Sequence, residues 1–550
     1  MPLTLIPISA NAQINPPPSL PPQPEPAEPE TLPLLEEILP EIETPKPQSQ
    51  PALEGVPDTL FIKKIAVVGS TVFSPDEIAK VLKPYTLRRL SFVELLEAQK
   101  AITQLYLDNG YITSGAYIPP QKLQDGIATI EVIEGTVADI EIEGLDRLNS
   151  GYIRSRLNIA TQAPVNREKL LNALQLLKLN PLISTVSAEL AAGTKTGTSI
   201  LKIRVAEADP VDFILSWDNY RAPSVGTNRR QAQLTHRNLL GFGDRFNVAY
   251  INTDGSNSLS NLSYSIPVNA RNGTLDLRYS YTDSEIIEEP FNQADIKSES
   301  SIYDLAFRQP LYQTANQDLA IGLAFSRTNS QSTVQDQPLP TTGSDSEGKT
   351  NISALRFFQE YTKRDAKQVF ALRSQFSLGI DVFDATDNGS NSPDSKFLAW
   401  RGQAQYLRQF NSNLSFIWRS DLQFANEPLV PIEQFSLGGA ISVRGYRQDS
   451  LLGDNGLFTS AEIRATVLGI PDWSTSLELT PFLDFGKVWN SDDLSIDTNT
   501  LLSLGLGLRL LISDRFAARL DYGIPLVDLK IDEDTLQENG VYFSLELKPF

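Results

Sequence analysis

Two short motifs in the C-terminal third of the chain each carry one charged residue among apolar residues and glycine. The first is Val443-Arg444-Gly445-Tyr446, and the second is Phe482-Leu483-Asp484-Phe485-Gly486. A planar guanidinium and a carboxylate can form two parallel charge-assisted hydrogen bonds. Gly445 also permits a turn where a Cβ atom would clash. The motifs suggest an ion pair in a polar interior; the alternative is a solvated loop arginine and an unrelated polar residue on a strand.

The elements that must position these residues are a loop and two strands. Leu437-Gly438-Gly439 stands shortly before the arginine motif, and we interpret it as the base of the same loop. Residues 457–467 lie between the motifs and 477–488 surround the aspartate, and both segments alternate between apolar and other residues. Such alternation predicts β-strands.

Other residues that could do chemistry carry weaker signals. The carboxylate pairs Glu288-Glu289 and Asp492-Asp493 lie in predicted polar turns, and Asp532-Glu533-Asp534 lacks the glycine and spacing of a calcium loop. The loop 384–394 is rich in Asp and Asn, but a surface loop explains it as well as a weak calcium site does. His236 is the only histidine, which argues against histidine catalysis and zinc binding. We therefore predict no enzyme, no catalytic residue, no cofactor and no metal.

The composition narrows the class of protein further. The chain has 550 residues, a net charge of −20 and no cysteine. The negative charge argues against a nucleic-acid partner, and the missing cysteines exclude a disulfide framework. No apolar stretch is long enough for a transmembrane helix, but transmembrane strands need only about 10 alternating residues each.

The first 57 residues predict no folded domain. Residues 1–12 end in Ala10-Asn11-Ala12, the small-x-small pattern of a signal-peptidase site, and we interpret them as the remnant of a secretory signal. Residues 13–57 form a proline-rich linker. Within it, residues 32–42 have apolar residues near helical spacing, and Pro40 limits them to a short helix.

Two small α+β modules follow, at 58–135 and 136–208. Each is predicted to run strand, helix, helix, strand, strand. In the first module, Ser74 with Glu77 and Ser91 with Glu94 form capping boxes that begin the two helices. The repeat length of roughly 70 residues and the similar openings at 65–69 and 140–144 indicate an internal repeat.

Residues 209–550 read as a membrane barrel. Sixteen alternating segments are separated by turns rich in Asn, Gly, Asp and Ser. In residues 499–512, for example, five leucines share one face, and Ser503, two glycines and Arg509 share the other. A soluble sandwich would also alternate, but a ring of sixteen strands is too wide for side chains to fill. Charged residues such as Arg278 and Arg419 would then line a wet lumen, so we predict a 16-stranded antiparallel transmembrane β-barrel.

The connections between the segments are asymmetric. Residues 269–272 and 411–413 are very short, whereas 329–349, 385–395 and 427–454 are long and polar. Short turns at one end and long loops at the other are typical of outer-membrane barrels. The chain ends on Phe550, an aromatic ending that is common in bacterial outer-membrane barrels and that we interpret as a signal to their insertion machinery.

Together, the two modules, the barrel, the Val-Arg-Gly-Tyr tip and the Phe-x-Asp-x-Gly strand resemble a known family. The chain from about residue 58 to 550 is similar to the outer-membrane transporters of two-partner secretion, the haemolysin/haemagglutinin activation and secretion proteins. Their superfamily includes the barrel-assembly protein and the chloroplast import channel. The modules look like polypeptide-transport-associated (POTRA) domains.

The resemblance implies a function and a location. It implies an outer-membrane translocase of a Gram-negative-type cell that acts as a monomer, with its POTRA modules in the periplasm. The modules would capture an unfolded secreted partner protein, haemagglutinin- or haemolysin-like and β-helical, with the edge near 186–190 as a candidate place. The loop 427–454 would fold into the lumen, where Arg444 would pair with Asp484. The membrane lipid and the barrel-assembly machinery are the other expected partners.

One departure and two rival functions stay open. Relatives often carry an N-terminal helix that plugs the barrel, and here only residues 32–42 could serve, flanked by Pro33 and Pro40. An assembly factor that inserts other barrels would share the barrel and both motifs, but such factors usually carry three or more modules. A passive porin would need neither the modules nor the motif pair.

Overall fold

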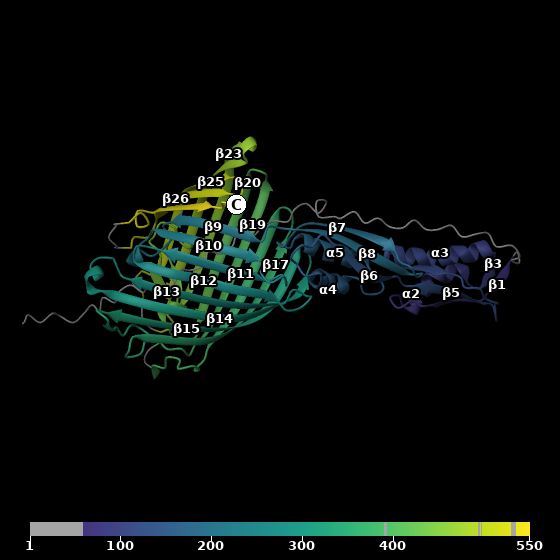
Figure 1. Ribbon diagram of the computed structural model, residues 1–550, viewed down its shortest axis with the longest axis horizontal. Coiled ribbons are helices and arrows are strands. Elements are labelled where there is room, and N and C mark those ends of the chain that lie inside the picture. Colours follow the sequence, from purple (N-terminus) through teal and green to yellow (C-terminus); the bar gives the residue numbers. More distant parts are fainter. Residues whose placement is uncertain (1–58, 390–392, 493–495, 497, 530–534, 550) are drawn as a thin grey trace, which may run out of the picture.

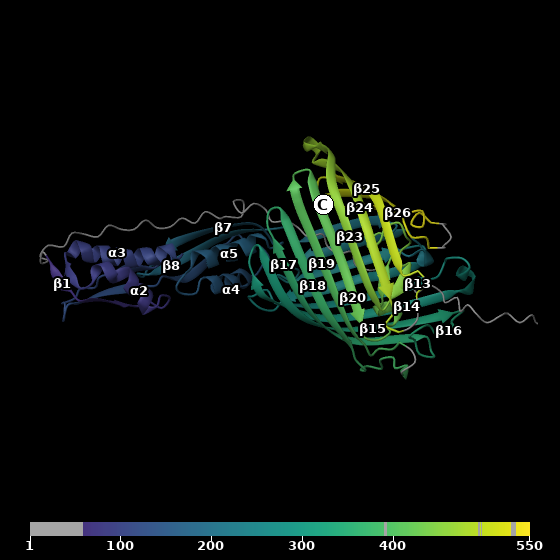
Figure 2. The same cartoon turned by 180° about the vertical axis from the view of Figure 1, so that it is seen from behind.

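The computed structural model describes residues 59–389, 393–492, 496, 498–529 and 535–549. Figures 1 and 2 show an elongated molecule in which a rod of two modules extends from one end of a large barrel. The predicted signal remnant, the proline-rich linker with its short helix, and Phe550 lie outside the described residues. In the described part of the chain, no helix is both long and apolar enough to cross a bilayer.

The first module packs two helices against a three-stranded sheet. Its elements are β1 (Leu60–Ile62), β2 (Lys64–Val68), α2 (Pro75–Leu82), a 3-10 turn η1 (Lys83–Tyr85), β3 (Arg88–Leu90), α3 (Phe92–Asp108), β4 (Gly115–Tyr117) and β5 (Ile127–Ile133). The sheet order is β2-β5-β4, with β2 parallel to β5. Both predicted capping boxes are present, at Ser74 and at Ser91.

One element of this module differs from the sequence prediction. The first strand of the module, which the sequence predicts as a single strand, is divided at Lys63, whose backbone N–H donates to the carbonyl of Gly126. β1 pairs instead with β3, a strand that the sequence did not predict. Both strands have only three residues, which is too short for alternation to be visible.

The second module repeats this plan. Its elements are β6 (Thr136–Glu143), α4 (Ser150–Ala160), α5 (Arg167–Lys178), β7 (Ile183–Ala192) and β8 (Thr198–Glu207). The sheet order is β6-β8-β7, so β7, which contains the predicted 186–190 segment, is an edge strand. Its buried core includes Ile153, Leu157, Leu170 and Leu174 from the two helices.

The repeat extends to a partly buried carboxylate at the end of each module's last strand. Glu134 accepts hydrogen bonds from the Thr71 backbone N–H and the Tyr106 hydroxyl, at 2.7 and 2.8 Å. Glu207 accepts three backbone N–H bonds, from residues 146–148, at 2.8–2.9 Å. Burial alone would raise the pKa of both carboxyls, but these hydrogen bonds outweigh it and hold each pKa below its ordinary value. Each carboxylate thus ties the last strand to the loop after the module's first strand.

Sixteen long strands close into the barrel, as predicted, and a two-residue strand, β16 (Gln337–Pro338), pairs antiparallel with the end of β15. The closure joins β27 to β9 in antiparallel register. The sixteen strands are β9 (Val211–Asp218), β10 (Arg229–Arg237), β11 (Arg245–Asn252), β12 (Ser256–Pro267), β13 (Thr274–Glu285), β14 (Ile296–Gln313), β15 (Gln317–Val334), β17 (Lys349–Arg364), β18 (Gln368–Gly379), β19 (Leu398–Asn411), β20 (Leu414–Ala425), β23 (Asn455–Ile470), β24 (Thr475–Trp489), β25 (Thr500–Ile512), β26 (Phe516–Pro525) and β27 (Val541–Leu547).

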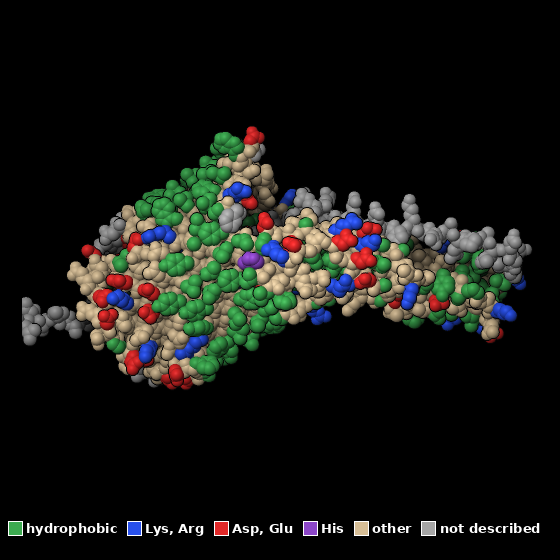
Figure 3. Space-filling model, in the orientation of Figure 1, with side chains coloured by type: hydrophobic (Ala, Val, Ile, Leu, Met, Phe, Trp, Pro, Cys, Tyr) green, Lys and Arg blue, Asp and Glu red, His purple; other side chains and the backbone are tan. Residues whose placement is uncertain are grey.

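The two faces of the barrel wall differ in the predicted way. On β25, Leu504, Leu506 and Leu508 are exposed on the outside, whereas Ser503 faces inward and is fully buried. Figure 3 shows hydrophobic side chains gathered over the outer wall of the barrel. Charged side chains lie on the modules and at the end of the barrel opposite the modules. This pattern fits a wall that meets lipid outside and polar groups inside.

The second module is fixed to the near end of the barrel, the end that carries the short turns. The Asn149 N–H donates to the Gly241 carbonyl (2.9 Å), and Arg156 Nε donates to Asn272 Oδ1 (2.7 Å). Asn172 also hydrogen-bonds the turn 313–315 through both ends of its amide. The long loops lie at the opposite, far end. One of them, 329–349, is shorter than predicted because β15 continues to Val334.

Candidate functional site

The loop 427–454 leaves the far end of the barrel and folds back into the lumen. It contains the 3-10 turn η5 (Pro431–Glu433) and two short strands, β21 (Phe435–Leu437) and β22 (Leu451–Gly453). These strands pair with each other in a separate sheet and not with the barrel ladder. Leu437 ends β21 and is fully buried, and Gly438 and Gly439 follow with positive φ, so the predicted loop base begins the turn toward the tip.

Arg444 at the loop tip contacts Asp484 on β24, as the two motifs suggest. Its Nε donates to Asp484 Oδ2 at 2.8 Å, and its Nη2 donates to Oδ1 at 2.9 Å. The Arg444 backbone N–H adds a third hydrogen bond to the same carboxylate, at 3.2 Å. Both side chains are 1% exposed or less. A bidentate, desolvated pair of this kind is strong and directional.

Further charges surround this pair, which we call the Arg444–Asp484 clasp. Arg444 Nη1 also donates to Glu462 on β23 at 2.8 Å. Glu462 in turn accepts from Arg519 at 2.7 Å and from Arg464 at 2.9 Å. Arg519 Nε donates to Asp521 at 2.7 Å. Three arginines and three carboxylates therefore pair with one another inside the wall, which offsets part of the cost of burying each charge.

All three residues of the Phe-x-Asp-x-Gly motif lie against the loop 427–454. The Arg444 guanidinium carbon lies 3.4 Å from the centre of the Phe482 ring, a cation–π contact. At Gly486, an added Cβ would lie 2.7 Å from Leu437 Cδ1 and 2.9 Å from Val443 Cγ2. The glycine therefore leaves the space in which the loop's apolar residues sit. The spacing of two keeps the three motif residues on the lumen face of one strand.

The rest of the tip rests on the last strands of the barrel. Gly445 has φ +99° and lies against Gly523 of β26, where a Cβ on Gly523 would be 2.6 Å from the Gly445 nitrogen. The Gly445 N–H donates to the Tyr542 hydroxyl at 2.9 Å, and that hydroxyl donates to the Tyr446 carbonyl. The Tyr446 hydroxyl donates to the Leu502 carbonyl at 2.9 Å. Every residue of the Val-Arg-Gly-Tyr motif is thus in contact with the wall or buried.

Three further ion pairs, made by two arginines, hold the loop on either side of the tip. Arg447 binds Glu288 with both terminal nitrogens, at 2.7 and 2.8 Å, and reaches Glu538 at 3.1 Å. Arg356 on β17 binds Glu433 at 2.6 Å. Glu288, expected as a solvated turn residue, is therefore a contact of the loop.

Sequence reasoning did not find Glu462, Asp521 or Tyr542. The alternating pattern does put Glu462 on the lumen face of β23, together with Ser460 and Arg464. The sequence alone does not distinguish one lumen-facing carboxylate from another, however. Only the closed barrel shows which strands the loop tip contacts. Among the described residues, no group of three or more His, Cys, Asp or Glu could hold a metal ion.

Known proteins resemble this chain both in its first module and over most of its length. Residues 60–135 match the POTRA domain, ShlB-type. The outer membrane transporter CdiB of Escherichia coli O6:K15:H31 (strain 536 / UPEC) is 25% identical over 505 residues, covering 90% of this chain and 83% of that one. The heme/hemopexin transporter protein HuxB of Haemophilus influenzae (strain 86-028NP) is 24% identical, covering 83% and 81%.

Solved structures agree on the fold. CdiB from Escherichia coli superposes with a TM-score of 0.71 at 22% identity, covering 94% of both chains. BamA from Haemophilus ducreyi lacking POTRA domains 1–3 has a TM-score of 0.53 at 15% identity, covering 89% of this chain and all of that one. Residues 197–510, more than half of the chain, match the haemolysin secretion/activation protein family ShlB/FhaC/HecB, and the chain belongs to that family.

Proposed function

We propose that this outer-membrane transporter captures one unfolded exoprotein on its periplasmic modules and passes it through the barrel while the loop 427–454 moves aside. The exoprotein is a secreted, haemagglutinin- or haemolysin-like β-helical chain. Relatives named for haemolysin and for heme/hemopexin transport support a protein substrate of this class. The chain itself contributes binding, guidance and a path, and no enzymatic step.

The observation that carries the proposal is how the loop is attached. In the described part of the chain, each hydrogen bond from the tip (443–446) to the wall uses a side chain on at least one partner. The loop's own strands pair only with each other. The loop can therefore leave the lumen without breaking a barrel ladder, which a plug built into the wall could not do.

The edge strand β7 (Ile183–Ala192) supports the capture step. An extended peptide can add to such an edge through backbone hydrogen bonds, which accepts many sequences. The chain carries no phosphate-binding glycine loop. Folding of the exoprotein outside the cell is the driving force we propose.

The rival function, insertion of other barrels, has one observation in its favour, the BamA-like fold. That likeness concerns the fold alone. The family match covers most of the barrel, and only two modules lie between residue 59 and the barrel. We therefore favour secretion of a partner protein.

A reversible disulfide tests whether the loop must move. The ideal Cβ position at Gly486 lies 2.9 Å from Val443 Cγ2, which puts the two Cβ atoms near disulfide range. The chain has no cysteine of its own, so Val443→Cys/Gly486→Cys adds the only thiols. Oxidation should abolish export of the exoprotein into the medium. Reduction should restore export to the level of the Gly486→Cys single variant, which carries the added side chain against Leu437 without the crosslink.

The matched control ties two barrel strands and leaves the loop free. Ser258 and Thr282 are direct cross-strand partners on β12 and β13, with hydroxyls 2.8 Å apart. Ser258→Cys/Thr282→Cys should export equally when oxidised and when reduced. Full export by the oxidised Val443→Cys/Gly486→Cys protein would show that the tip stays in place during transport and would refute the proposed path.

A further inference from the structure

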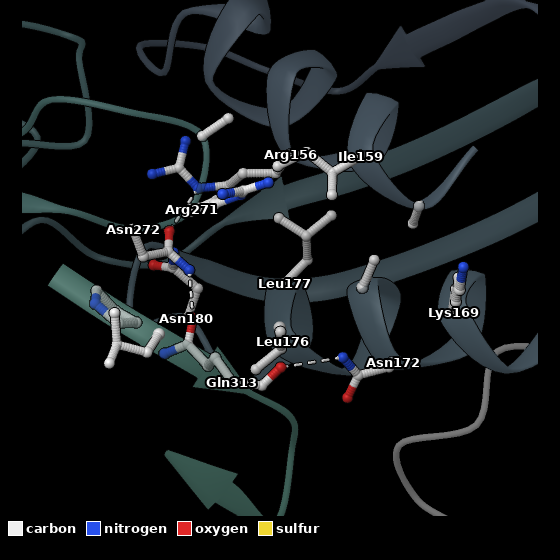
Figure 4. Close-up of a pocket in the computed structure, with 15 residues that line it drawn as sticks. Arg156, Ile159, Lys169, Asn172, Leu176, Leu177, Asn180, Arg271, Asn272 and Gln313 are labelled. Carbon is white, nitrogen blue, oxygen red and sulfur yellow. Dashed lines mark hydrogen bonds between the residues drawn. The ribbon is translucent and has the colours of Figure 1, made fainter. Parts of the chain in front are cut away.

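A pocket of about 270 Å³ lies where the second module meets the near end of the barrel. Helices α4 and α5 form one side, and the turn 270–272 with the end of β14 forms the other. Figure 4 shows Arg156 and Arg271 at one end of the pocket, Lys169 at the other, and Leu176 and Leu177 between them. This pocket is separate from the lumen and from the loop tip.

The charge of the pocket is opposite to that of the chain. It is lined by Arg156, Lys169 and Arg271 and by no carboxylate. Among the described residues, none of the three cations forms an ion pair, although the whole chain carries a net charge of −20. Arg156 is held by Asn272 and by the Tyr152 ring, 3.5 Å away, and its buried Nη2 has no hydrogen-bond partner in the described structure. Such a group favours an anionic ligand that can accept hydrogen bonds.

The pocket is also continuous with the lipid-facing wall. Leu311, which lines it, is 59% exposed on the outer face of β14, and the neighbouring Tyr312 is 53% exposed. Ile159 of α4 adds a third exposed apolar side chain at the same place. A soluble anion would gain nothing from these residues, whereas acyl chains would cover them.

We propose that this pocket binds one anionic phospholipid of the periplasmic leaflet. The phosphate lies between Arg156 and Arg271, and Lys169 adds a third positive charge at the other end of the pocket. The acyl chains run along Leu311 and the outer wall of the barrel. An acidic segment of a passing polypeptide could satisfy the cations but not the apolar wall. The bound lipid would bridge the module and the barrel, which adds an anchor to the direct hydrogen bonds at this junction.

Native mass spectrometry of the full chain in neutral detergent tests this. Phosphatidylglycerol, phosphatidylcholine with the same acyl chains, and inorganic phosphate are the three probes. The wild-type chain should retain one phosphatidylglycerol and bind it more tightly than the other two. Arg271→Ala/Lys169→Ala should weaken that binding by roughly tenfold or more, since it removes two of the three positive charges that line the pocket. Both side chains are exposed, so the variant should fold.

The control is Arg167→Ala, an exposed cation on the same helix that does not line the pocket. It should bind phosphatidylglycerol as the wild type does. Equal retention of phosphatidylglycerol by the wild type and the double variant would overturn the proposal. So would inorganic phosphate binding as tightly as the lipid, which indicates a free-anion site. Displacement of the lipid by an acidic peptide at equimolar concentration would likewise assign the pocket to the polypeptide. None of these readouts depends on secretion, so their outcome is separate from the proposed function.

Discussion

Arg444 lies close to three carboxylates at once, so its removal should affect both the stability of the barrel and the position of the loop tip. It binds Asp484 at 2.8 and 2.9 Å and Glu462 at 2.8 Å, and Asp521 lies 3.7 Å away. Lysine could supply charge but not the planar pair of donors that spans both oxygens of Asp484. The residue therefore fixes both the place and the orientation of the loop tip.

Arg444→Ala should destabilise the barrel and its loop by about 3–5 kcal/mol, because it leaves Asp484 buried without its partner. Urea unfolding in lipid vesicles, followed by tryptophan fluorescence, measures this. We also expect barrel insertion to persist and export to fall. Arg204→Ala is the control, since the side chains of Arg204 and its partner Glu143 are 71% and 72% exposed, and it should cost less than about 1 kcal/mol. Normal export by Arg444→Ala would remove any role for the clasp in transport.

The motifs pointed to this contact because their unusual residues had no other evident use. A lone arginine beside glycine and a lone aspartate in an apolar strand suggest each other. Glu462 and Asp521 could not be predicted in the same way. Many inward strand positions in a wet barrel carry polar residues, and the choice among them depends on which wall the loop approaches.

At the scale of elements, alternation was sufficient for the barrel. All sixteen strands follow from the period-two pattern, because one face meets lipid and the other a polar lumen along the whole length of each strand. The same pattern fails for β1 and β3, which have three residues each. Their pairing depends on the turn at Lys63, which has no pattern to detect.

The lowered pKa values of Glu134 and Glu207 lead us to expect that the modules lose stability in acid. Hydrogen bonds hold the folded-state pKa of Glu207 below its ordinary value of 4.5. A carboxyl whose pKa is lowered in the folded state stabilises the fold at pH values above its ordinary pKa. This stabilisation is lost as the pH falls through the folded-state pKa. The module should therefore loosen below about pH 4.5, first at the amides of 146–148 that Glu207 binds.

Hydrogen exchange of these amides, read by mass spectrometry, measures the effect. Glu207→Gln should exchange faster than wild type at neutral pH, and its exchange protection should change little with pH below 4.5, because the titrating group is gone. Glu143→Gln is a suitable control, since that side chain is 72% exposed. An identical pH profile in wild type and Glu207→Gln would contradict the assignment.

At the scale of the whole molecule, the modules and the barrel form one continuous structure. Module two rests on three near-end turns, and the first module rests on the second through bonds such as Arg167 N–H to the Gly110 carbonyl, at 2.8 Å. A captured chain would thus be held at a set distance from the pore. This geometry gives the edge strand β7 a defined position relative to the barrel opening.

The junction depends on a close fit between Tyr152 and Gly243. A Cβ on Gly243 would lie 2.3 Å from the Tyr152 ring, so Gly243→Ala must push the module away from the turn. Spin labels on single engineered cysteines in module two and in the barrel report the distance, because the chain has no other thiol. The distance distribution should broaden in Gly243→Ala and export should fall with it. Gly389→Ala is the matched control, since its φ of +68° also disfavours alanine but nothing lies within 4 Å of the added Cβ. If the Gly243→Ala distribution stayed as narrow as that of Gly389→Ala, the direct contacts would not be what holds the modules in line with the pore.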